Sequence, residues 1–448
     1  MKEAFLNRMR TYLQDEYEDW LACLQQPRFR GLRVNTARCD TETFLRLADW
    51  LCEPSPICPQ SFYVTREHLG LHPLHAAGAF YLQEPSASSA VEVLDVQPHD
   101  WVLDLCAAPG GKSTQIAAKL EHTGFLLSNE IEAKRAQTLL SNMERLGFSE
   151  YAVSCAAPAQ VCGEMAGCFD RVLVDAPCSG EGMFRKHEQA VEDWSEHVYA
   201  FSVDLRLDCA ARQREILACA HEALREGGIL VYSTCTYAME ENEETVKAFL
   251  ERFDDMELID CGVSFGRPGL PLDDFDSSKV RRIFPMDRGE GHFIAKLRRK
   301  GDAPRRARKE EKDKQPDPCV QAFLQDQLSD PRMHLLVQGD TVLGRRQPFV
   351  RLGKIRVLRQ GIRLGDVVKK RFEPHHHFYM AAVHQPLLRH VRELDLAQSE
   401  QFLKGHPLPD PARGFICLRY QGFPLGFGKG DGNWIKNRYP KGLRQMGR

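Results

Sequence analysis

The sequence lacks several patterns that would assign it to a familiar class. None of its 15 cysteines forms a C-x-x-C pair and no zinc-type Cys/His spacing occurs, so we expect neither a disulfide framework nor a metal site. No apolar run approaches the roughly 18 residues that a membrane span needs. The first twenty residues are acidic and contain no apolar stretch, which argues against a secretory signal. We therefore expect a cytoplasmic monomer without a membrane partner.

The net charge of −2 conceals two opposed halves. Residues 301–448 contain 28 Lys and Arg against 15 Asp and Glu, a net charge of +13, whereas residues 1–300 carry −15. A strongly basic half of this kind favours a polyanionic partner such as nucleic acid, although part of the charge could contact the acidic half.

Short apolar runs that predict strands alternate with predicted helices between residues 96 and 300. This alternation is typical of a parallel, doubly wound sheet, which binds ligands beyond the carboxyl ends of its strands. Residues 3–24 predict a helix of the lead-in. The predicted strands are 101–105, 124–129, 151–155, 171–175, 228–233, 257–261 and 292–297, and the helices between them include 113–120, 132–146 and 212–225.

A glycine-bearing turn follows the first of these strands. Its residues are Cys106, Ala107, Ala108, Pro109, Gly110, Gly111 and Lys112. Glycine permits close backbone approach, and the helix that follows offers free N–H groups. The fingerprints G-x-G-x-x-G and Walker A are absent, which disfavours a cofactor with a pyrophosphate. Glu130, after the second strand, could accept the hydroxyls of a ribose, and S-adenosylmethionine meets these demands.

Two cysteines follow two further strands, in Asp175-Ala-Pro-Cys178 and in Ser233-Thr-Cys235-Thr236. In a methyltransferase-type strand order these two strands are neighbours, so both thiols could face one pocket. A thiolate that adds to C6 of a pyrimidine makes C5 nucleophilic enough to accept a methyl group, which is covalent catalysis. Asp175 is placed to contact N3 of the base, and the second cysteine could assist release. This chemistry does not decide which cysteine attacks.

These segments closely resemble the NOP/Sun family of RNA cytosine-5 methyltransferases. The resemblance lies in Asp104–Lys112, Asp175–Lys186, Thr234-Cys235-Thr236, Gly289–Phe293 and Leu32–Asn35. It implies that Cys235 is the nucleophile, that Cys178 acts in product release, and that S-adenosylmethionine contacts Cys106–Lys112, Glu130 and Asp175. The family usually has an acid near the adenine, where this sequence has Ala157.

Four C-terminal segments carry a narrower resemblance: Leu358–Gly365, Lys369–Pro374, Gly422–Lys429 and Lys436–Gly442. They resemble the F-type bacterial small-subunit (16S) rRNA enzymes, whose last segment is a PUA-like RNA-binding module. We expect RNA contacts from Arg33, Asn35, Lys369, Lys370, Arg371, Lys436, Arg438 and Lys441, with Phe378, Tyr379, Trp434 and Tyr439 interleaved for stacking. Arg33 and Asn35 could instead be structural. We interpret His375–His377 as solvated or phosphate-facing, not as a metal site.

The expected fold is therefore α/β, with a Rossmann-like class I methyltransferase sheet, an N-terminal α/β lead-in and a C-terminal β-rich PUA-like module. The expected domains are an N-terminal RNA-binding region (1–80), the methyltransferase domain (81–298), a charged linker (299–318), an intermediate RNA-binding domain (319–385) and the PUA-like domain (386–448).

The predicted function is transfer of a methyl group from S-adenosylmethionine to C5 of a cytidine in 16S rRNA, with rRNA or the assembling 30S subunit as partner. Two alternatives remain open at this point. One is methylation of tRNA, because the catalytic motifs do not identify the RNA. The other is a noncatalytic ribosome-assembly factor that keeps the fold for RNA binding.

Overall fold

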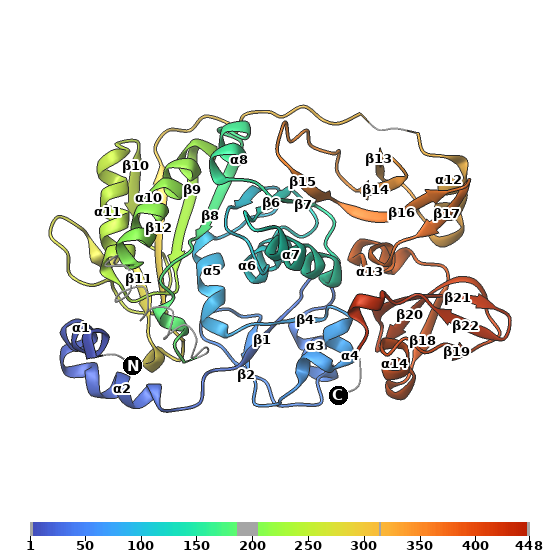
Figure 1. Cartoon of the computed structure of the whole chain (residues 1–448), viewed down its shortest axis with the longest axis horizontal. Helices are drawn as coiled ribbons and strands as arrows, with labels where there is room; N and C mark the ends of the chain where they lie inside the picture. The colour runs from blue at the N-terminus through green and yellow to red at the C-terminus, as the bar shows by residue number, and fades with distance from the viewer. Residues whose placement is uncertain (1–2, 186–204, 313–314, 446–448) are drawn as a thin grey trace.

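The computed structural model describes residues 3–185, 205–312 and 315–445 of the chain. Within these ranges it contains four β-sheets (Figure 1). No helix in the described ranges is long and apolar enough to cross a membrane. Three of the sheets are small and lie below and to the right of the largest one in Figure 1. The largest sheet carries the motifs described above.

The central sheet has the strand order β10-β12-β9-β8-β5-β6-β7-β15, and β11 pairs with β12. Strands β5 to β9 are parallel, as predicted. Beyond β9 the sheet departs from parallel pairing, because β12 runs antiparallel to its neighbours β9, β10 and β11. Their bounds are β5 Trp101–Asp104, β6 Phe125–Asn129, β7 Tyr151–Ser154, β8 Phe169–Asp175, β9 Leu224–Thr234, β10 Met256–Ile259, β11 Arg281–Ile283, β12 His292–Arg299 and β15 Val357–Gln360.

Helices cover both faces of this sheet, and each face has its own apolar core. Apolar residues of α8, α10 and α11 pack on one face, together with Leu103 and Val172. Those of α5, α6 and α7 pack on the other, together with Val102 and Leu173. The bounds are α5 Ser89–Leu94, α6 Gly111–Lys119, α7 Ala133–Leu146, α8 Pro158–Glu164, α10 Leu205–Ala223 and α11 Glu243–Arg252.

The N-terminal region begins with two helices instead of the single one predicted. Gln14 has a φ of 48°, which breaks the helix between α1 and α2. A small sheet of order β2-β3-β1-β4 follows. The bounds are α1 Glu3–Leu13, α2 Tyr17–Leu24, β1 Gly31–Val34, α3 Thr41–Leu47, β2 Glu53–Pro54, β3 Ser61–Tyr63, α4 Pro73–Ala76 and β4 Phe80–Leu82.

The C-terminal part forms two β-rich modules, with sheets β13-β14-β16-β17 and β18-β20-β21-β22-β19. The last module shares an apolar core with the N-terminal sheet, in which Leu32 and Phe80 pack together with Phe402 and Leu418. The bounds are α12 Pro318–Gln327, β13 His334–Gln338, β14 Thr341–Arg345, β16 Ile362–Val368, β17 Arg371–Pro374, α13 His376–Met380, β18 Val391–Leu394, α14 Leu396–Leu403, β19 Leu408–Pro409, β20 Arg413–Tyr420, β21 Phe423–Asp431 and β22 Trp434–Asn437.

One C-terminal strand belongs to the central sheet. β15 lies antiparallel to β7 at its edge (Figure 1). The backbone N–H of Cys155 donates to the carbonyl of Arg356, 2.9 Å away, and that of Gly361 donates to Tyr151 at the same distance. The C-terminal half therefore completes the catalytic sheet as well as adding surface to it.

Candidate active site

The predicted cofactor turn connects β5 to α6. Gly110 caps the helix with a φ of 110°, in the region that favours glycine. A Cβ at this position would lie 3.0 Å from Leu139 of α7, so the residue must also be small. Arg135 of α7 donates a hydrogen bond to the carbonyl of Ala108 at 3.0 Å and fixes the turn from that side.

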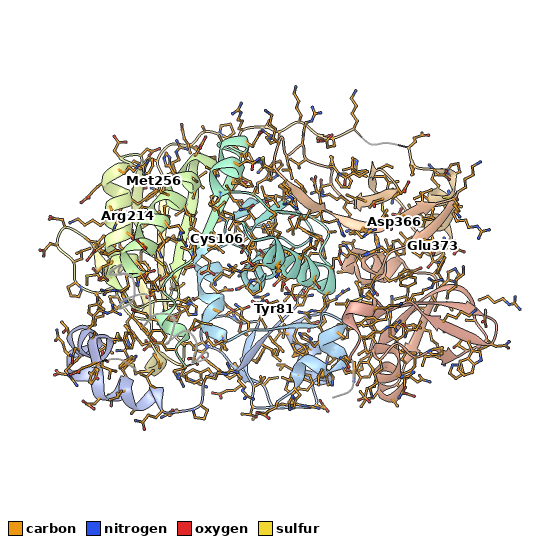
Figure 2. The ribbon with its side chains drawn as sticks, viewed as in Figure 1. Tyr81, Cys106, Arg214, Met256, Asp366 and Glu373 are labelled. Carbon is orange, nitrogen blue, oxygen red and sulfur yellow. The ribbon has the colours of Figure 1, made fainter. Side chains whose placement is uncertain are left out.

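A cavity of about 500 Å³ opens over this turn. Figure 2 shows two of the residues that line it, Tyr81 from β4 and Cys106 from the turn, near the centre of the molecule. The predicted site residues along the cavity are Cys106, Ala107, Ala108, Pro109, Gly111, Lys112, Asp175 and Cys235. It is also lined by residues that the sequence did not single out, among them Gln83, Glu84, Asp104, Arg135, Met183 and His292.

Lys112 and Asp175 form an ion pair on the cavity wall. Lys112 Nζ lies 2.7 Å from Asp175 Oδ2, and Ser233 Oγ donates to Oδ1 of the same carboxylate at 2.9 Å. Burial disfavours the charged amine, but the Asp175 carboxylate outweighs burial and holds the pKa of Lys112 above its ordinary value. The carboxylate is therefore fixed in orientation at the end of β8.

The two motif cysteines meet beside this pair. Cys178 Sγ lies 3.3 Å from Cys235 Sγ, because β8 and β9 are parallel neighbours, as predicted. The hydrogen bond between the two sulfurs and the burial of Cys178 raise the pKa of its thiol well above the ordinary value. Cys178 therefore keeps its proton and can donate it toward Cys235. All 15 cysteines of the chain are free.

Glu241 holds the loop that carries Cys178, a role that sequence reasoning missed. Its carboxylate accepts hydrogen bonds from the N–H and hydroxyl of Ser179, and Gln213 donates to it at 2.8 Å. Burial raises the pKa of Glu241 to about 7. No local motif marks this residue, since it follows Cys235 by six residues in an ordinary acidic segment.

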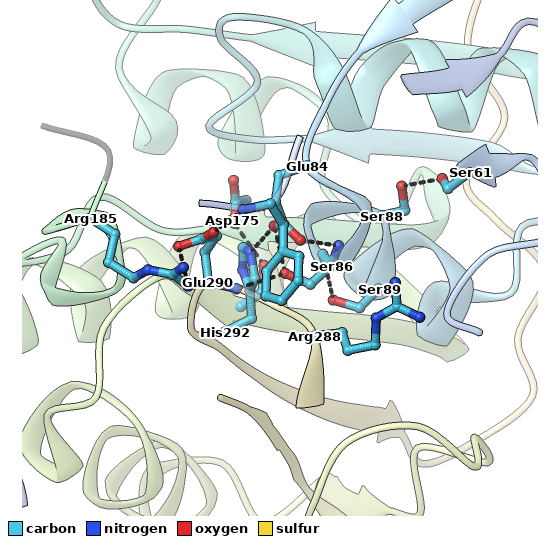
Figure 3. Close-up of polar contacts among 12 residues, drawn as sticks. Ser61, Glu84, Ser86, Ser88, Ser89, Asp175, Arg185, Arg288, Glu290 and His292 are labelled. Atoms are coloured by element: carbon cyan, nitrogen blue, oxygen red, sulfur yellow. Dashed lines mark hydrogen bonds and ion pairs between the residues drawn. The ribbon is translucent and has the colours of Figure 1, made fainter. Parts of the chain in front are cut away.

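The cavity is also lined by His292 and Glu84, both labelled in Figure 3. His292 Nε2 lies 3.7 Å from Glu84 Oε2, and Ser86 donates to the Glu84 carboxylate through its N–H at 2.7 Å and its hydroxyl at 2.5 Å. His292 begins β12, whose neighbour β9 leads directly to Cys235. His292 of the Gly289–Phe293 motif therefore lines the cavity, although the family resemblance gave it no role.

Asp104 and Glu130 occupy the ends of β5 and β6. Asp104 is fully buried, and burial raises the pKa of its carboxyl to about 7. Glu130 accepts a hydrogen bond from the N–H of Glu132 at 3.0 Å and lies 3.6 Å from Arg135, which lines the cavity. Ala157 ends the loop after β7 and precedes α8 without a side-chain cap.

The prediction that Arg33 and Asn35 contact RNA was wrong, because both are buried. Arg33 donates to Gln83, Thr114 and the carbonyl of Gly111, and so ties β1 to the start of α6. Asn35 donates to the carbonyls of Gly78 and Leu146 at 2.8 and 2.9 Å. The structural alternative holds for both.

The C-terminal cations predicted to contact RNA are exposed: Lys369, Lys370, Arg371, Lys436, Arg438 and Lys441. Among the aromatic residues interleaved with them only Trp434 is exposed, while Phe378, Tyr379 and Tyr439 are buried and cannot stack on bases. The prediction that His375–His377 are solvated was also wrong. His376 and His377 are buried in α13, where burial lowers their pKa values. The described residues contain no group of side chains that could hold a metal ion.

Four family models match the chain. They are 16S rRNA methyltransferase RsmB/F at residues 91–298, the N-terminal domain of 16S rRNA methyltransferase RsmF at 1–85, the RsmF rRNA methyltransferase first C-terminal domain at 322–381, and the methyltransferase RsmF PUA domain at 389–445. Ribosomal RNA small subunit methyltransferase F of Klebsiella pneumoniae (strain 342) is 32% identical over 480 residues, covering 100% of this chain and 97% of that protein. The chain belongs to the RsmF family of 16S rRNA methyltransferases.

Solved structures agree with this family at the level of the fold. A methyltransferase homologue from Pyrococcus horikoshii has a TM-score of 0.57 and 27% identity over 67% of this chain and 95% of its own. NSun6 from Pyrococcus horikoshii has a TM-score of 0.58 and 22% identity, over 67% and 99%. The predictions of an S-adenosylmethionine-dependent RsmF-family enzyme, of its methyltransferase sheet and of its PUA-like module are confirmed.

Proposed function

We propose that this chain methylates C5 of a cytidine in 16S rRNA through a covalent bond between Cys235 Sγ and C6 of the base. The observation that carries the proposal is the 3.3 Å approach of Cys178 Sγ to Cys235 Sγ at a cavity that Lys112 and Asp175 also line. Two thiols beside a fixed carboxylate are the groups that this reaction needs.

The cavity residues fit S-adenosylmethionine, which supplies an electrophilic methyl group when bound. Asp104 Oδ1 is buried and has no hydrogen-bond partner among the described residues, so a donor from a ligand would satisfy it. The Cys106–Lys112 turn presents backbone at the start of α6 and would hold the ligand beside Asp104. Glu130 would accept the ribose hydroxyls, since its partner Arg135 faces the cavity.

The proposed chemistry begins when the Cys235 thiolate adds to C6. This addition breaks the C5–C6 double bond and places its electron pair on C5, which could then take the methyl group that S-adenosylmethionine would supply beside the Cys106–Lys112 turn. The C5 proton leaves to solvent, the double bond re-forms and the C6–sulfur bond breaks. Cys178, which keeps its proton, would donate a hydrogen bond to the departing Cys235 sulfur.

Asp175 would accept hydrogen bonds from the exocyclic amine of the cytosine and from N3 when the ring is protonated there, with Lys112 holding the carboxylate in place. Its two oxygens are already oriented by Lys112 and Ser233, so little reorganisation is needed when the base arrives. The target base must leave its stack to reach this depth, which costs a few kcal/mol.

Trapping of the RNA adduct tests the proposal. In Cys178→Ala we expect a covalent RNA–protein species to accumulate in a denaturing gel, because release is slowed. In Cys235→Ala we expect no adduct, and we expect the methylation rate to fall by at least about a thousandfold. Cys319→Ala, at a half-buried cysteine outside the cavity, serves as the control. An adduct that persists in Cys235→Ala would reject the assigned roles.

We further propose that the exposed cations of the two C-terminal segments bind rRNA or the assembling 30S subunit, and that the enzyme acts as a monomer in the cytoplasm. The domain division expected from the sequence is part of this proposal. It is supported by the four sheets: the central sheet is built from residues 101–299 and β15, and the three small sheets are built from residues 31–82 and 334–437. Bisulfite sequencing of rRNA and tRNA from a deletion strain would identify the modified nucleotide.

A further inference from the structure

Two hollows flank residues 28–30, between the helices and the sheet of the N-terminal region. One, of about 430 Å³, is lined by Arg28, Phe29, Arg30, Arg66 and His68 together with apolar residues of β4 and its surroundings. The other, of about 220 Å³, shares Arg28–Arg30 and adds Tyr63 and Arg288. Together they form a groove that combines arginine side chains with aromatic rings; we refer to it as the N-terminal groove.

The N-terminal groove adjoins the catalytic cavity. Leu82, Gln83 and Glu84 line both the larger hollow and the cavity that contains Cys235. Leu82 is 39% exposed and presents apolar surface where the two hollows adjoin. An RNA chain that delivers a base to Cys235 would therefore pass close to this groove.

The cations of the groove are available for a new partner. Arg28 is exposed and has no ion-pair or hydrogen-bond partner among the described residues. Arg30 pairs with Glu67 and Arg66 with Asp49, and all four of these side chains are at least 40% exposed. Exposed pairs of this kind contribute little to stability, so a phosphate can replace the carboxylate at small cost.

The segment that carries Arg28 and Arg30 is anchored to Glu290 and Arg185. The N–H of Phe29 donates to Glu290 Oε1 at 2.8 Å, and Arg185 donates to the carbonyls of Gln26 and Pro27 at 2.9 Å. The Arg185 guanidinium also lies over the Phe29 ring, 5.6 Å from its centre. Figure 3 shows Arg185 and Glu290 side by side, close to His292 of the cavity. These contacts fix the position of the groove relative to the catalytic cavity.

We propose that the N-terminal groove binds single-stranded RNA adjacent to the target cytidine, with its phosphates on Arg28, Arg30 and Arg66. This inference rests on the proposed function. A flipped base leaves its neighbours unstacked, and single-stranded RNA is held through its phosphates by exposed cations, which this groove supplies. In this proposal the groove, and not the buried Arg33 and Asn35, is the RNA-contacting part of the N-terminal region.

Binding of a fluorescein-labelled, single-stranded RNA oligonucleotide with one cytidine tests the groove by anisotropy at several salt concentrations. For Arg28→Ala and Arg66→Ala we expect about three- to tenfold weaker binding each. The slope of log Kd against log salt should fall by about 0.7 for each lost contact. Affinity for S-adenosylmethionine, measured by titration calorimetry, should not change.

Arg298→Ala is the matched control. Arg298 pairs with Glu257 at 2.6 Å and is half exposed, like Arg30, but it lies near the far end of β12 from His292. Unchanged RNA affinity and salt slope in Arg28→Ala and Arg66→Ala would overturn the inference. An effect equal to that of Arg298→Ala would do the same, because it would reflect net charge alone.

Adduct formation separates this inference from the proposed function. The substitutions are combined with Cys178→Ala and the RNA is supplied at saturation. Adduct formation at saturation together with unchanged affinity would reject the groove and keep the function. Weakened affinity without adduct formation in Cys178→Ala alone would keep the groove and reject the covalent mechanism.

Discussion

Charged side chains have opposite surroundings at the catalytic edge and on the C-terminal surface. Lys112 and Asp175 are partly buried, 2.7 Å apart and aligned by a third residue, whereas Lys369, Lys370 and Arg371 stand exposed at the turn into β17. A fixed pair can direct a single proton or hydrogen bond, while exposed cations provide a field for a polyanion. Whether a charged side chain serves the reaction or the binding of a polyanion therefore depends more on its position in the fold than on its residue type.

Breaking a buried ion pair in the C-terminal half should have the largest effect on stability. Such a pair differs from the exposed C-terminal cations described above, because it holds the fold together. Arg345 at the end of β14 lies 2.8 Å from Glu150, which precedes β7, and both are buried. Arg345→Met leaves the carboxylate without its partner, so we expect a loss of about 3–5 kcal/mol of unfolding free energy. Urea unfolding measures it. Arg332→Met, at an exposed pair with Asp330, should change nothing measurable.

Removing the amine at the catalytic edge should cost activity with little loss of stability. Lys112→Met frees the Asp175 carboxylate to rotate away from N3, and misplacement of this kind costs on the order of 100-fold in kcat/KM. Lys119→Met on the same helix is the control, since Lys119 pairs with Glu92 at 3.0 Å away from the cavity. Equal effects of the two substitutions in a methylation assay would show that helix stability, not the Asp175 contact, is responsible.

Removing exposed charge should weaken RNA binding and spare the chemistry. For the triple substitution Lys436→Ala, Arg438→Ala, Lys441→Ala we expect about tenfold weaker rRNA binding and a shallower salt dependence, with kcat at saturating RNA unchanged. Deleting everything after residue 318 would not test this, because it would also remove β15 from the central sheet. Lys404→Ala, an exposed lysine of the same module, is the control. An unchanged salt slope would contradict the RNA role of this surface.

The last expected effect is a pH dependence of stability near the catalytic cysteines. Burial raises the pKa of Glu241 to about 7, from 4.5 in the ordinary case. Between these values the folded protein holds a proton that the unfolded chain has released, so stability falls as the pH rises, by up to about 1.4 kcal/mol per pH unit. Glu241→Gln should flatten this dependence in thermal unfolding from pH 5 to 7, whereas Glu226→Gln at the surface should not.

The sequence was sufficient for the parts of the fold that local patterns encode. Strands β5 to β9 lie within a few residues of their predictions because each is an apolar run followed by a turn or motif. The direction of β12 was not predictable, since a strand reads alike in parallel and antiparallel pairing. β15 was missed because the run Val357-Leu358-Arg359-Gln360 is short and half polar.

The candidate site divides in the same way. Cys178, Cys235 and the Cys106–Lys112 turn are marked by their motifs. In the structure Cys235 and the turn line one cavity, and Cys178 lies 3.3 Å from Cys235. Arg33 was misassigned because the sequence does not reveal whether an arginine of a strand faces solvent or, as here, the start of α6. Glu241 could not be found, because its importance comes only from partners distant in sequence, such as Ser179.

The late strand β15 has a consequence for how the enzyme is made. Translation proceeds from the N-terminus, so β5 to β12 leave the ribosome before residues 357–360 exist, and β7 remains an open sheet edge in the meantime. Open edges invite pairing with other chains. A nascent chain that stalls in the C-terminal half would therefore present the cell with an aggregation-prone intermediate instead of a smaller working enzyme, which favours full-length synthesis as the condition for activity.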